Sequence, residues 1–433
     1  MSTTPPIDPT SAAALAEHGL DFRLVDTSNT AEFFPWIEVD FRGFLGPRPT
    51  RENVERFAQG TADRRTTGVY DPTAAEPEAP VATVNSWATA LTVPGRREVM
   101  AWGISSVTVA PTHRRRGIAR ALLESELRVA HAQGIPLAML TVSESTIYGR
   151  FGFAPATLAT ELEIDTRRAR WAGPTPTGRV HFVAVETLRE QVLPLVEAKR
   201  LDTPGEIATW PHLWDRTFGL SSDDESTKNK LRGIRYDDSD GVPRGFALYT
   251  IDPNESNFSE HNANVVSLVA TTDDAYAGLW SHLLELDLVS KLSVHLRSTA
   301  EPLRYQVADF RAVHDVDTRD HLWVRILDVA ASLTARTYSA PLDLVIAVTD
   351  ELGFADGTYR IVVDDSLAAT IEVSVDAPAV TLSVNELGSL YLGGISATAL
   401  ARAGRIAEHE PGAVEALERA FHSAVVPHLP VWF

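Results

Sequence analysis

A short basic segment of the sequence has the residue types that bind a phosphate group. Arg114, Arg115 and Arg116 precede Gly117, and an apolar helical pattern begins at Ile118. A helix N-terminus presents unpaired backbone N–H groups and the positive end of the helix dipole to an anion. A glycine lets the phosphate approach the backbone, and guanidinium groups add charge-assisted hydrogen bonds. The segment therefore predicts a site for a phosphorylated ligand, and a basic helix start that contacts nucleic acid is the alternative.

A second group of polar residues follows the apolar segment 136–142. Ser143 and Glu144 stand where a strand would end, and Tyr148 comes four residues later. A phenol with its ordinary pKa of about 10 keeps its proton at neutral pH, so Tyr148 can donate that proton to a leaving group. Each residue also has a structural alternative, because Ser143 can be a helix N-cap and Tyr148 can pack beside Phe151.

The elements that must position these residues can be predicted from hydrophobic periodicity. Alternating apolar residues predict strands over 81–93 and 101–110. An amphipathic helix is expected over 115–133 and should stop at Gly134, and 136–142 reads as a buried strand. Together these elements predict a mixed α/β unit that covers residues 20 to 165.

The order of residues in the basic turn narrows the class of ligand that it can bind. The turn is not a Walker loop and lacks the glycines of a dinucleotide fingerprint. Its Arg-x-x-Gly-x-Ala sequence resembles the signature of the GNAT acyltransferases, which implies binding of acetyl-CoA without a metal. We expect the sheet to splay between 101–110 and 136–142, leaving a slot for the cofactor. The cofactor-binding residues implied are Val107, Thr108, Val109, Arg114, Arg115, Arg116, Gly117, Ile118, Ala119, Arg120, Ser143 and Glu144.

The middle of the chain repeats the plan of the first unit. The segment VVSLVATTDDAYAGLWSHLLELD again predicts a strand, a turn and an amphipathic helix. Asp273 and Asp274 occupy the turn where the first copy has arginines, and such carboxylates cap a helix but repel a pyrophosphate. We therefore expect residues 166–318 to form a second, degenerate GNAT-like domain that cannot bind CoA at this turn.

The C-terminal part of the chain has a different pattern. Several alternating strands are followed by helices from about residue 384, which is typical of an α+β domain. The segment NELGSLYLGGISATALARAGRI resembles the sterol-carrier-like domain. The predicted fold is therefore two tandem GNAT-like mixed α/β sheets followed by a sterol-carrier-like α+β domain, with domain ranges 1–165, 166–318 and 319–433.

Taken together, PTHRRRG, SE-x-x-IYGRFG and the sterol-carrier-like end resemble the Eis family of bacterial N-acetyltransferases. The resemblance implies a homohexamer, Tyr148 as the general acid and the carboxylate of the last residue, Phe433, as the base. The tail ends in Trp432 and Phe433 and is apolar, so we expect it to dock. Burial would raise the pKa of the α-carboxylate and let it accept a proton. A tail that only seals its own domain is the alternative.

The family's amine pocket is broad and acidic, and Asp40, Phe41 and Phe44 are its candidate residues here. Arg42 and Gly43 lie close to the place where an acidic pocket residue is expected, which puts the substrate range in question. Amines such as aminoglycosides are the main expectation. A protein lysine acetyltransferase, or a lipid-binding sterol-carrier-like module with a regulatory GNAT domain, are the alternatives.

Composition bounds the remaining possibilities. The chain has 433 residues, a net charge of −19 and no cysteine, which excludes disulfides and thiolate chemistry. An acidic chain argues against nucleic acid as a partner, and no apolar run reaches the length of a membrane span. No metal-binding motif is present. We expect a cytoplasmic enzyme with a flexible leader of about 15 residues, and secretion without a signal peptide stays open.

Overall fold

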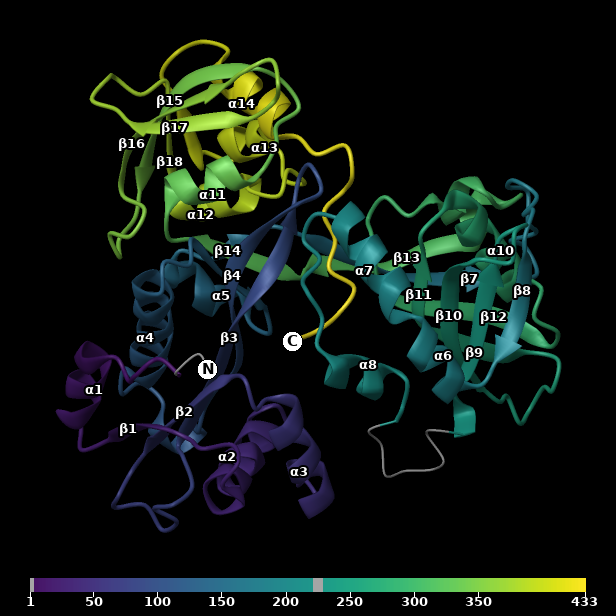
Figure 1. The fold of residues 1–433 in the computed structure, drawn as a ribbon, viewed down its shortest axis with the longest axis horizontal. Coiled ribbons are helices and arrows are strands. Elements are labelled where there is room, and N and C mark those ends of the chain that lie inside the picture. The colour runs from purple at the N-terminus through teal and green to yellow at the C-terminus, as the bar shows by residue number, and fades with distance from the viewer. Residues whose placement is uncertain (1–3, 221–228) are drawn as a thin grey trace. The chain divides into compact units, whose positions relative to one another are not determined.

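The structure of the protein is a computed structural model that describes residues 4–220 and 229–433 (Figure 1). The chain forms two compact units. The first comprises the residues up to Ala156 together with Leu322–Ser423 and Trp432–Phe433, and the second comprises Thr157–His321 and Ala424–Val431. Within the described ranges, no helix has the length and apolarity needed to cross a membrane. Each unit is described by itself below.

The first unit contains a seven-stranded mixed sheet that carries the predicted site. Its strand order is β1-β2-β3-β4-β5-β14-β6, and β4 and β5 form a parallel pair in a sheet whose other pairs are antiparallel. The strands are β1 (Asp21–Leu24), β2 (Arg65–Tyr70), β3 (Ala82–Val93), β4 (Arg97–Val109), β5 (Leu137–Thr141), β6 (Ala154–Pro155) and β14 (Leu322–Ile326).

Two strands at the predicted domain boundaries pair differently from the expectation. The strand expected to close the first unit, β7 (Leu158–Asp165), pairs with β12 and β13 in the second unit's sheet. Conversely β14, expected in the C-terminal domain, inserts between β5 and β6 of the first sheet. Periodicity identified both strands correctly, but it carries no information about which sheet a strand joins. The three domain ranges themselves stay a prediction.

The N-terminal segment is helical, which corrects the expectation of a flexible leader. Helix α1 (Pro9–Ala16) starts at the N-cap Asp8, whose carboxylate accepts a hydrogen bond from the Ser11 N–H. The Ser11 hydroxyl donates to the carbonyl of Ala121 at 2.7 Å, and Leu15 is buried. The Pro, Ser and Ala composition suggested disorder, but one buried leucine and one cap suffice to dock this short helix on α4.

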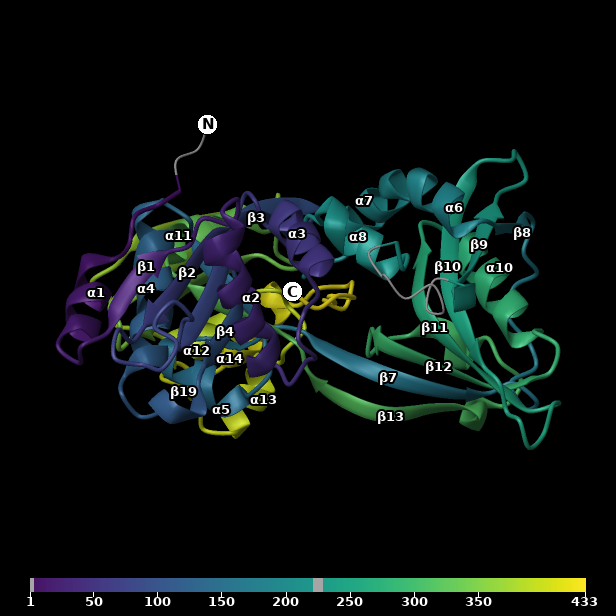
Figure 2. The same cartoon turned by 90° about the horizontal axis from the view of Figure 1, so that it is seen from below.

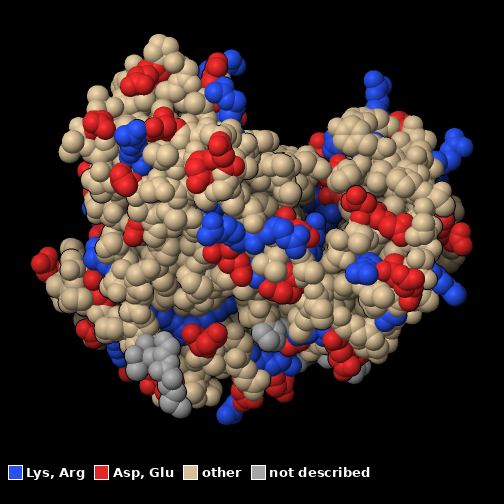
Figure 3. Space-filling view, turned by 45° about the horizontal axis from the view of Figure 1, so that its top comes forward, with Lys and Arg blue, Asp and Glu red and all other residues tan. Residues whose placement is uncertain are grey.

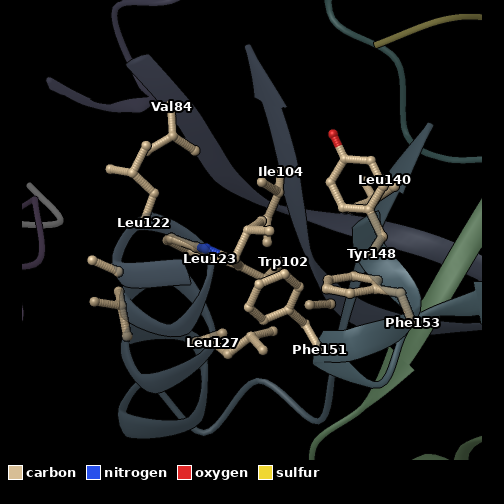
Figure 4. Close-up of a cluster of buried hydrophobic side chains, with 14 of the residues drawn as sticks. Val84, Trp102, Ile104, Leu122, Leu123, Leu127, Leu140, Tyr148, Phe151 and Phe153 are labelled. Carbon is tan, nitrogen blue, oxygen red and sulfur yellow. The ribbon is translucent and has the colours of Figure 1, made fainter. Parts of the chain in front are cut away.

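Helices cover both faces of the first sheet. On one face, Leu122, Leu123 and Leu127 of α4 (Ile118–Ala132) are fully buried against Trp102 and other sheet residues (Figure 4). On the other face, α2 (Thr30–Gly43) and α3 (Arg51–Gly60) pack together, and Trp36 of α2 donates its indole N–H to a β2 carbonyl. In the sequence, α5 (Ser145–Tyr148) and the 3-10 turn Gly149–Phe151 connect β5 to β6.

The second unit is built on its own seven-stranded sheet, in the order β13-β7-β12-β11-β10-β9-β8. The strands β7 and β13 run side by side as an antiparallel pair (Figure 2). Helix α10 (Asp273–Leu284) follows β11 and buries Trp280 and Leu283 against the sheet, as the internal repeat predicts. The remaining elements are β8 (Arg179–Val183), β9 (Arg232–Asp237), β10 (Pro243–Asp252), β11 (His261–Ala270), β12 (Val289–Arg297), β13 (Val313–Asp320), α6 (Val185–Gln191), α7 (Leu193–Asp202) and α8 (Pro211–Thr217).

The sterol-carrier-like region of the first unit has a five-stranded sheet in the order β17-β16-β15-β18-β19. Its helix α12 (Val384–Leu390) starts with a capping box in which Ser383 and Glu386 satisfy each other's backbone N–H groups. Helix α12 packs on β14, where Gly388 approaches the carbonyl of Val324 closely. The other elements are β15 (Leu342–Thr349), β16 (Gly357–Val363), β17 (Ala369–Val373), β18 (Val380–Ser383), β19 (Ile406–Glu408), α11 (Val329–Ala335), α13 (Ala397–Arg402) and α14 (Ala413–Phe421).

On the face drawn in Figure 3, acidic and basic side chains lie next to one another in several places.

Candidate active site

The basic turn has the backbone geometry of an anion site. Between β4 and α4, Arg115 and Gly117 both adopt left-handed backbone conformations, with φ of 64° and 76°. Gly117 is the N-cap of α4, and no side chain in the described ranges caps this helix start. A Cβ added to Gly117 would meet open space, so the route to the helix N–H groups is clear. Such a turn fits the pyrophosphate of a CoA thioester.

The basic side chains of this turn have different surroundings. Arg114, Arg115 and Arg120 are exposed. Arg116 instead turns back toward the protein, where it donates to the carbonyl of His18 at 2.9 Å and lies 3.6 Å from Asp71. Thus the three exposed arginines can reach a ligand, whereas Arg116 braces the turn.

Asp71 holds the base of the same turn. Its carboxylate accepts hydrogen bonds from the Thr73 side chain and backbone, and it contacts Nε2 of His113 at 3.1 Å. These bonds hold the pKa of Asp71 well below its ordinary value. Asp71 therefore stays charged and fixes His113 and Arg116, while the N–H groups at the start of α4 are left to a ligand.

The corresponding turn of the second unit is filled by the protein itself. The hydroxyl of Thr272, the N-cap of α10, accepts from the Ala275 N–H. The carboxylate of Asp274 accepts from the N–H and hydroxyl of Thr177 at 3.0 and 2.9 Å, and from the hydroxyl of Tyr236. This geometry agrees with the expectation of a degenerate second copy.

The expected splay of the first sheet is confirmed. The parallel ladder between β4 and β5 ends at the pair Gly103 and Met139, although β4 continues to Val109. Ser106 forms a bulge with φ of 56°, where the pairing of β4 with β3 shifts register. Past Gly103, one edge of β4 therefore faces the slot with Val107 and Val109 at its end. The Thr108 side chain points elsewhere, since its hydroxyl lies 2.6 Å from that of Thr83.

Tyr148 lies at the end of α5, beside the slot. Its ring packs edge-on against Phe153, with ring centroids 6.4 Å apart, and its hydroxyl points away from the apolar cluster (Figure 4). Burial raises the pKa of Tyr148 above its ordinary value, Glu144 raises it further, and a hydrogen bond with Ser143 opposes the shift. The phenol therefore keeps its proton at neutral pH, as proton donation requires. Ser143 and Glu144 are exposed.

The last residue of the chain docks beside β3 (Figure 1) and contacts the end of β5. The hydroxyl of Thr141, the final residue of β5, donates to a terminal carboxylate oxygen of Phe433 at 2.7 Å. The Phe433 ring packs edge-on against Trp87, with centroids 5.4 Å apart. Trp87 in turn lies against Gly103, where a Cβ would come within 3.0 Å of the indole. The expectation that the apolar tail docks is confirmed by these contacts.

Asp40 is a buried carboxylate on the same face as Phe433. It lies near the C-terminal end of α2, and its Oδ1 atom is buried with no hydrogen-bond partner in the part of the chain that the structure describes. Burial raises the pKa of Asp40 to about 7, against a hydrogen bond from Ser106 that lowers it. The ring of Phe41 packs against that of Phe57, with ring centroids 5.3 Å apart, whereas Phe44 is half exposed.

Sequence reasoning missed Thr141 and Trp87 as neighbours of Phe433, and it missed Arg64 as a neighbour of Trp87. The guanidinium of Arg64 stacks over Trp87 at 3.7 Å and donates to Asn85 at 3.1 Å. The alternation of side chains along β3 carried a signal for Trp87. Val84 and Ser86 face α4, so Asn85 and Trp87 lie on the opposite face of the sheet. Among the described residues, no group of three or more His, Asp or Glu side chains is arranged to hold a metal.

Family models match most of the chain. An acetyltransferase (GNAT) domain matches residues 25–156, a second acetyltransferase (GNAT) domain matches 205–326, and a sterol carrier protein domain matches 329–430. The predicted fold class of two tandem GNAT-like domains and a sterol-carrier-like domain is therefore confirmed. With the uncapped helix start, these matches define the chain as a GNAT acetyltransferase, a class that uses acetyl-CoA.

Full-length relatives narrow the class further. The chain is 36% identical over 408 residues to an uncharacterized N-acetyltransferase of Streptomyces coelicolor, covering 93% of this chain and 97% of that one. It is 35% identical over 347 residues to the N-acetyltransferase Eis of Mycobacterium tuberculosis, covering 77% and 81%. The solved structure of Eis1 from Mycobacterium abscessus matches with a TM-score of 0.82 and 29% identity over 96% of this chain and 100% of that one. The chain belongs to the Eis family of N-acetyltransferases.

Proposed function

We propose that this enzyme transfers the acetyl group of acetyl-CoA to amines such as aminoglycosides, with Tyr148 as the acid and the terminal carboxylate of Phe433 as the base. The observation that carries the proposal is the uncapped N-terminus of α4, with Gly117 at the N-cap, next to the fork between β4 and β5. This combination offers one site for a phosphate and one slot for an extended thioester.

The cofactor is assigned to the turn and the edge of β4. The backbone N–H groups from Gly117 to Arg120 and the exposed Arg114, Arg115 and Arg120 side chains would hold the pyrophosphate. Acetyl-CoA supplies an activated acetyl thioester to this site. The free backbone edge at Val107 and Val109 would orient it, and the exposed Ser143 and Glu144 lie where they can contact it.

Tyr148 and the Phe433 carboxylate are proposed to transfer the two protons of the reaction. The Phe433 carboxylate, held by Thr141, would accept a proton from the ammonium group of the substrate. The neutral amine would then attack the thioester carbonyl, so that an N–C bond forms as the C–S bond breaks. Tyr148 would donate its proton to the departing sulfur, since its raised pKa keeps it protonated at neutral pH. The buried Asp40 carboxylate would bind a second positive charge of the amine, with Phe41 and Phe44 beside it.

The remaining expectations are proposals as well. We infer a cytoplasmic homohexamer whose three domains cover residues 1–165, 166–318 and 319–433. Its partners would be small-molecule or peptide amines. The electrostatics do not favour nucleic acid, because the chain carries a net charge of −19.

The test is a thiol-release assay with acetyl-CoA and a panel of aminoglycosides, polyamines and lysine peptides. We expect turnover with polycationic amines, and loss of most turnover in Tyr148→Phe and in a chain that lacks Phe433. Both variants should still bind acetyl-CoA as the wild type does. Faster turnover of lysine peptides would shift the assignment to protein acetylation, and binding of apolar ligands but not CoA would refute the proposal.

A further inference from the structure

The short turn that follows Tyr148 is held by side chains from distant parts of the chain. Three alternate carbonyls of this turn, at Gly149, Phe151 and Phe153, accept side-chain hydrogen bonds. Asn385 of α12 donates to the carbonyls of Gly149 and Phe153 at 2.9 and 2.8 Å. A single amide group thus links both ends of the turn.

The central carbonyl is held by Arg325 of β14. Its Nε donates to Phe151 at 2.7 Å, and its Nη2 contacts both carboxylate oxygens of Asp350 at 2.8 Å. The side chains of Arg325 and Asp350 are 0% and 2% exposed, so solvent does not compete for these bonds. Asp350 is fixed in its turn by the N–H groups of Leu352 and Ala355.

The turn is shaped to receive this guanidinium. Gly152 has a φ of 84°, and a Cβ at this position would lie 2.4 Å from Nε of Arg325. Position 152 therefore requires glycine for two reasons. Its backbone is left-handed, and the Arg325 side chain occupies the space of a Cβ. Asn385 is equally constrained, because the capping box at Ser383 fixes the first turn of α12.

We infer that the sterol-carrier-like region is a positioning element of the active site, in which Asn385 and the Asp350–Arg325 pair hold the turn 149–153 and thereby orient Tyr148. Asn385 and Asp350 lie in the sterol-carrier-like region, and Tyr148 directly precedes the turn and packs against Phe153. This inference rests on the proposed role of Tyr148 as the acid. It assigns the region a task in acetyl transfer that needs no bound lipid.

Asn385→Ala tests the inference, because Asn385 is partly exposed and its loss should not unfold the protein. We expect kcat to fall about 10-fold while the KM for acetyl-CoA stays unchanged, since the turn at Gly117 is not touched. The alkaline limb of the kcat profile should move to lower pH, because a looser turn admits water and relieves the burial that raises the pKa of Tyr148.

Arg360→Ala is the matched control. Arg360 of β16 lies on the surface of the same region and binds Asp343 at 2.8 Å, so its loss should leave kcat and the pH profile as in the wild type. The double variant Asn385→Ala with Tyr148→Phe should be no slower than Tyr148→Phe alone, because Asn385 acts through Tyr148.

The outcomes separate the inference from the function on which it rests. A slow Tyr148→Phe enzyme combined with an Asn385→Ala enzyme of wild-type kcat and pH profile would overturn the positioning role and leave the acid in place. Wild-type turnover in Tyr148→Phe would instead remove the acid role, and the inference with it. Additive losses in the double variant would show that Asn385 acts independently of Tyr148, and would overturn the inference.

Discussion

The hydroxyl of Thr141 donates a 2.7 Å hydrogen bond to the terminal carboxylate of Phe433. This contact joins the end of a central strand to the last residue of the chain, 292 positions away. A hydrogen bond to the charged form of a carboxylate lowers its pKa and fixes its direction. Thr141 therefore fixes the position of the proposed base.

Thr141→Val should reduce kcat about 10-fold, since valine keeps the shape of threonine but cannot donate this hydrogen bond. The KM for acetyl-CoA should stay unchanged, because the anion site at Gly117 is not touched. Thr141→Ser keeps the hydroxyl and serves as the control. Equal kcat values for the valine and serine variants would contradict this role.

The arginines of the basic turn should separate into two groups. Arg114→Ala with Arg115→Ala should raise the KM for acetyl-CoA about 10-fold and weaken its dependence on salt, because both side chains are exposed beside the anion site. Arg116→Ala should mainly lower the thermal unfolding midpoint, since Arg116 binds His18 and Asp71. Steady-state kinetics and thermal unfolding of the same preparations measure both effects. An Arg116 variant with the larger KM effect would reverse the assignment.

Asp40 should make amine binding depend on pH near neutrality. Because its pKa is raised to about 7, Asp40 is largely neutral at about pH 6 and charged at about pH 8. The KM for a polycationic amine should therefore fall over this interval, and Asp40→Asn should abolish the change. The folded pKa lies above the unfolded value, so wild-type stability declines as pH rises from about 4 to about 7, and the asparagine variant should lack this contribution.

Two buried histidines should make the second unit sensitive to acid. His321 donates to the carbonyl of Val431 at 2.9 Å, and His428 donates to that of Leu296 at 2.6 Å. Burial lowers their pKa values to about 4 and about 3. The unfolded chain therefore binds more protons than the folded one below about pH 6.5, and stability should fall as the pH drops from there.

His428→Gln provides the matching variant, because glutamine keeps an N–H donor but does not titrate. Urea unfolding at about pH 7 and about pH 5 should show a smaller loss of stability in the variant than in the wild type. Identical losses would mean that other groups cause the acid sensitivity.

The sequence predicted best what depends on neighbouring residues. The turn from Arg114 to Gly117 and the helix after it are local, so their spacing defines them without the rest of the fold. The contacts of Thr141 with Phe433 and of Asn385 with Gly149 join residues hundreds of positions apart, and no local pattern encodes such pairs. Asp40 is a candidate pocket residue from the sequence, a role that stays a prediction, and its raised pKa follows from burial that only the folded chain creates.

The place of β14 between β5 and β6 bears on how the chain is made. During synthesis, residue 326 leaves the ribosome long after β1–β5, so the first sheet emerges with a gap between β5 and β6. The unpaired edge of β5 would invite foreign strands for that interval. An N-terminal fragment cut at residue 165 would keep this gap permanently, and should aggregate rather than behave as a small stand-alone catalyst.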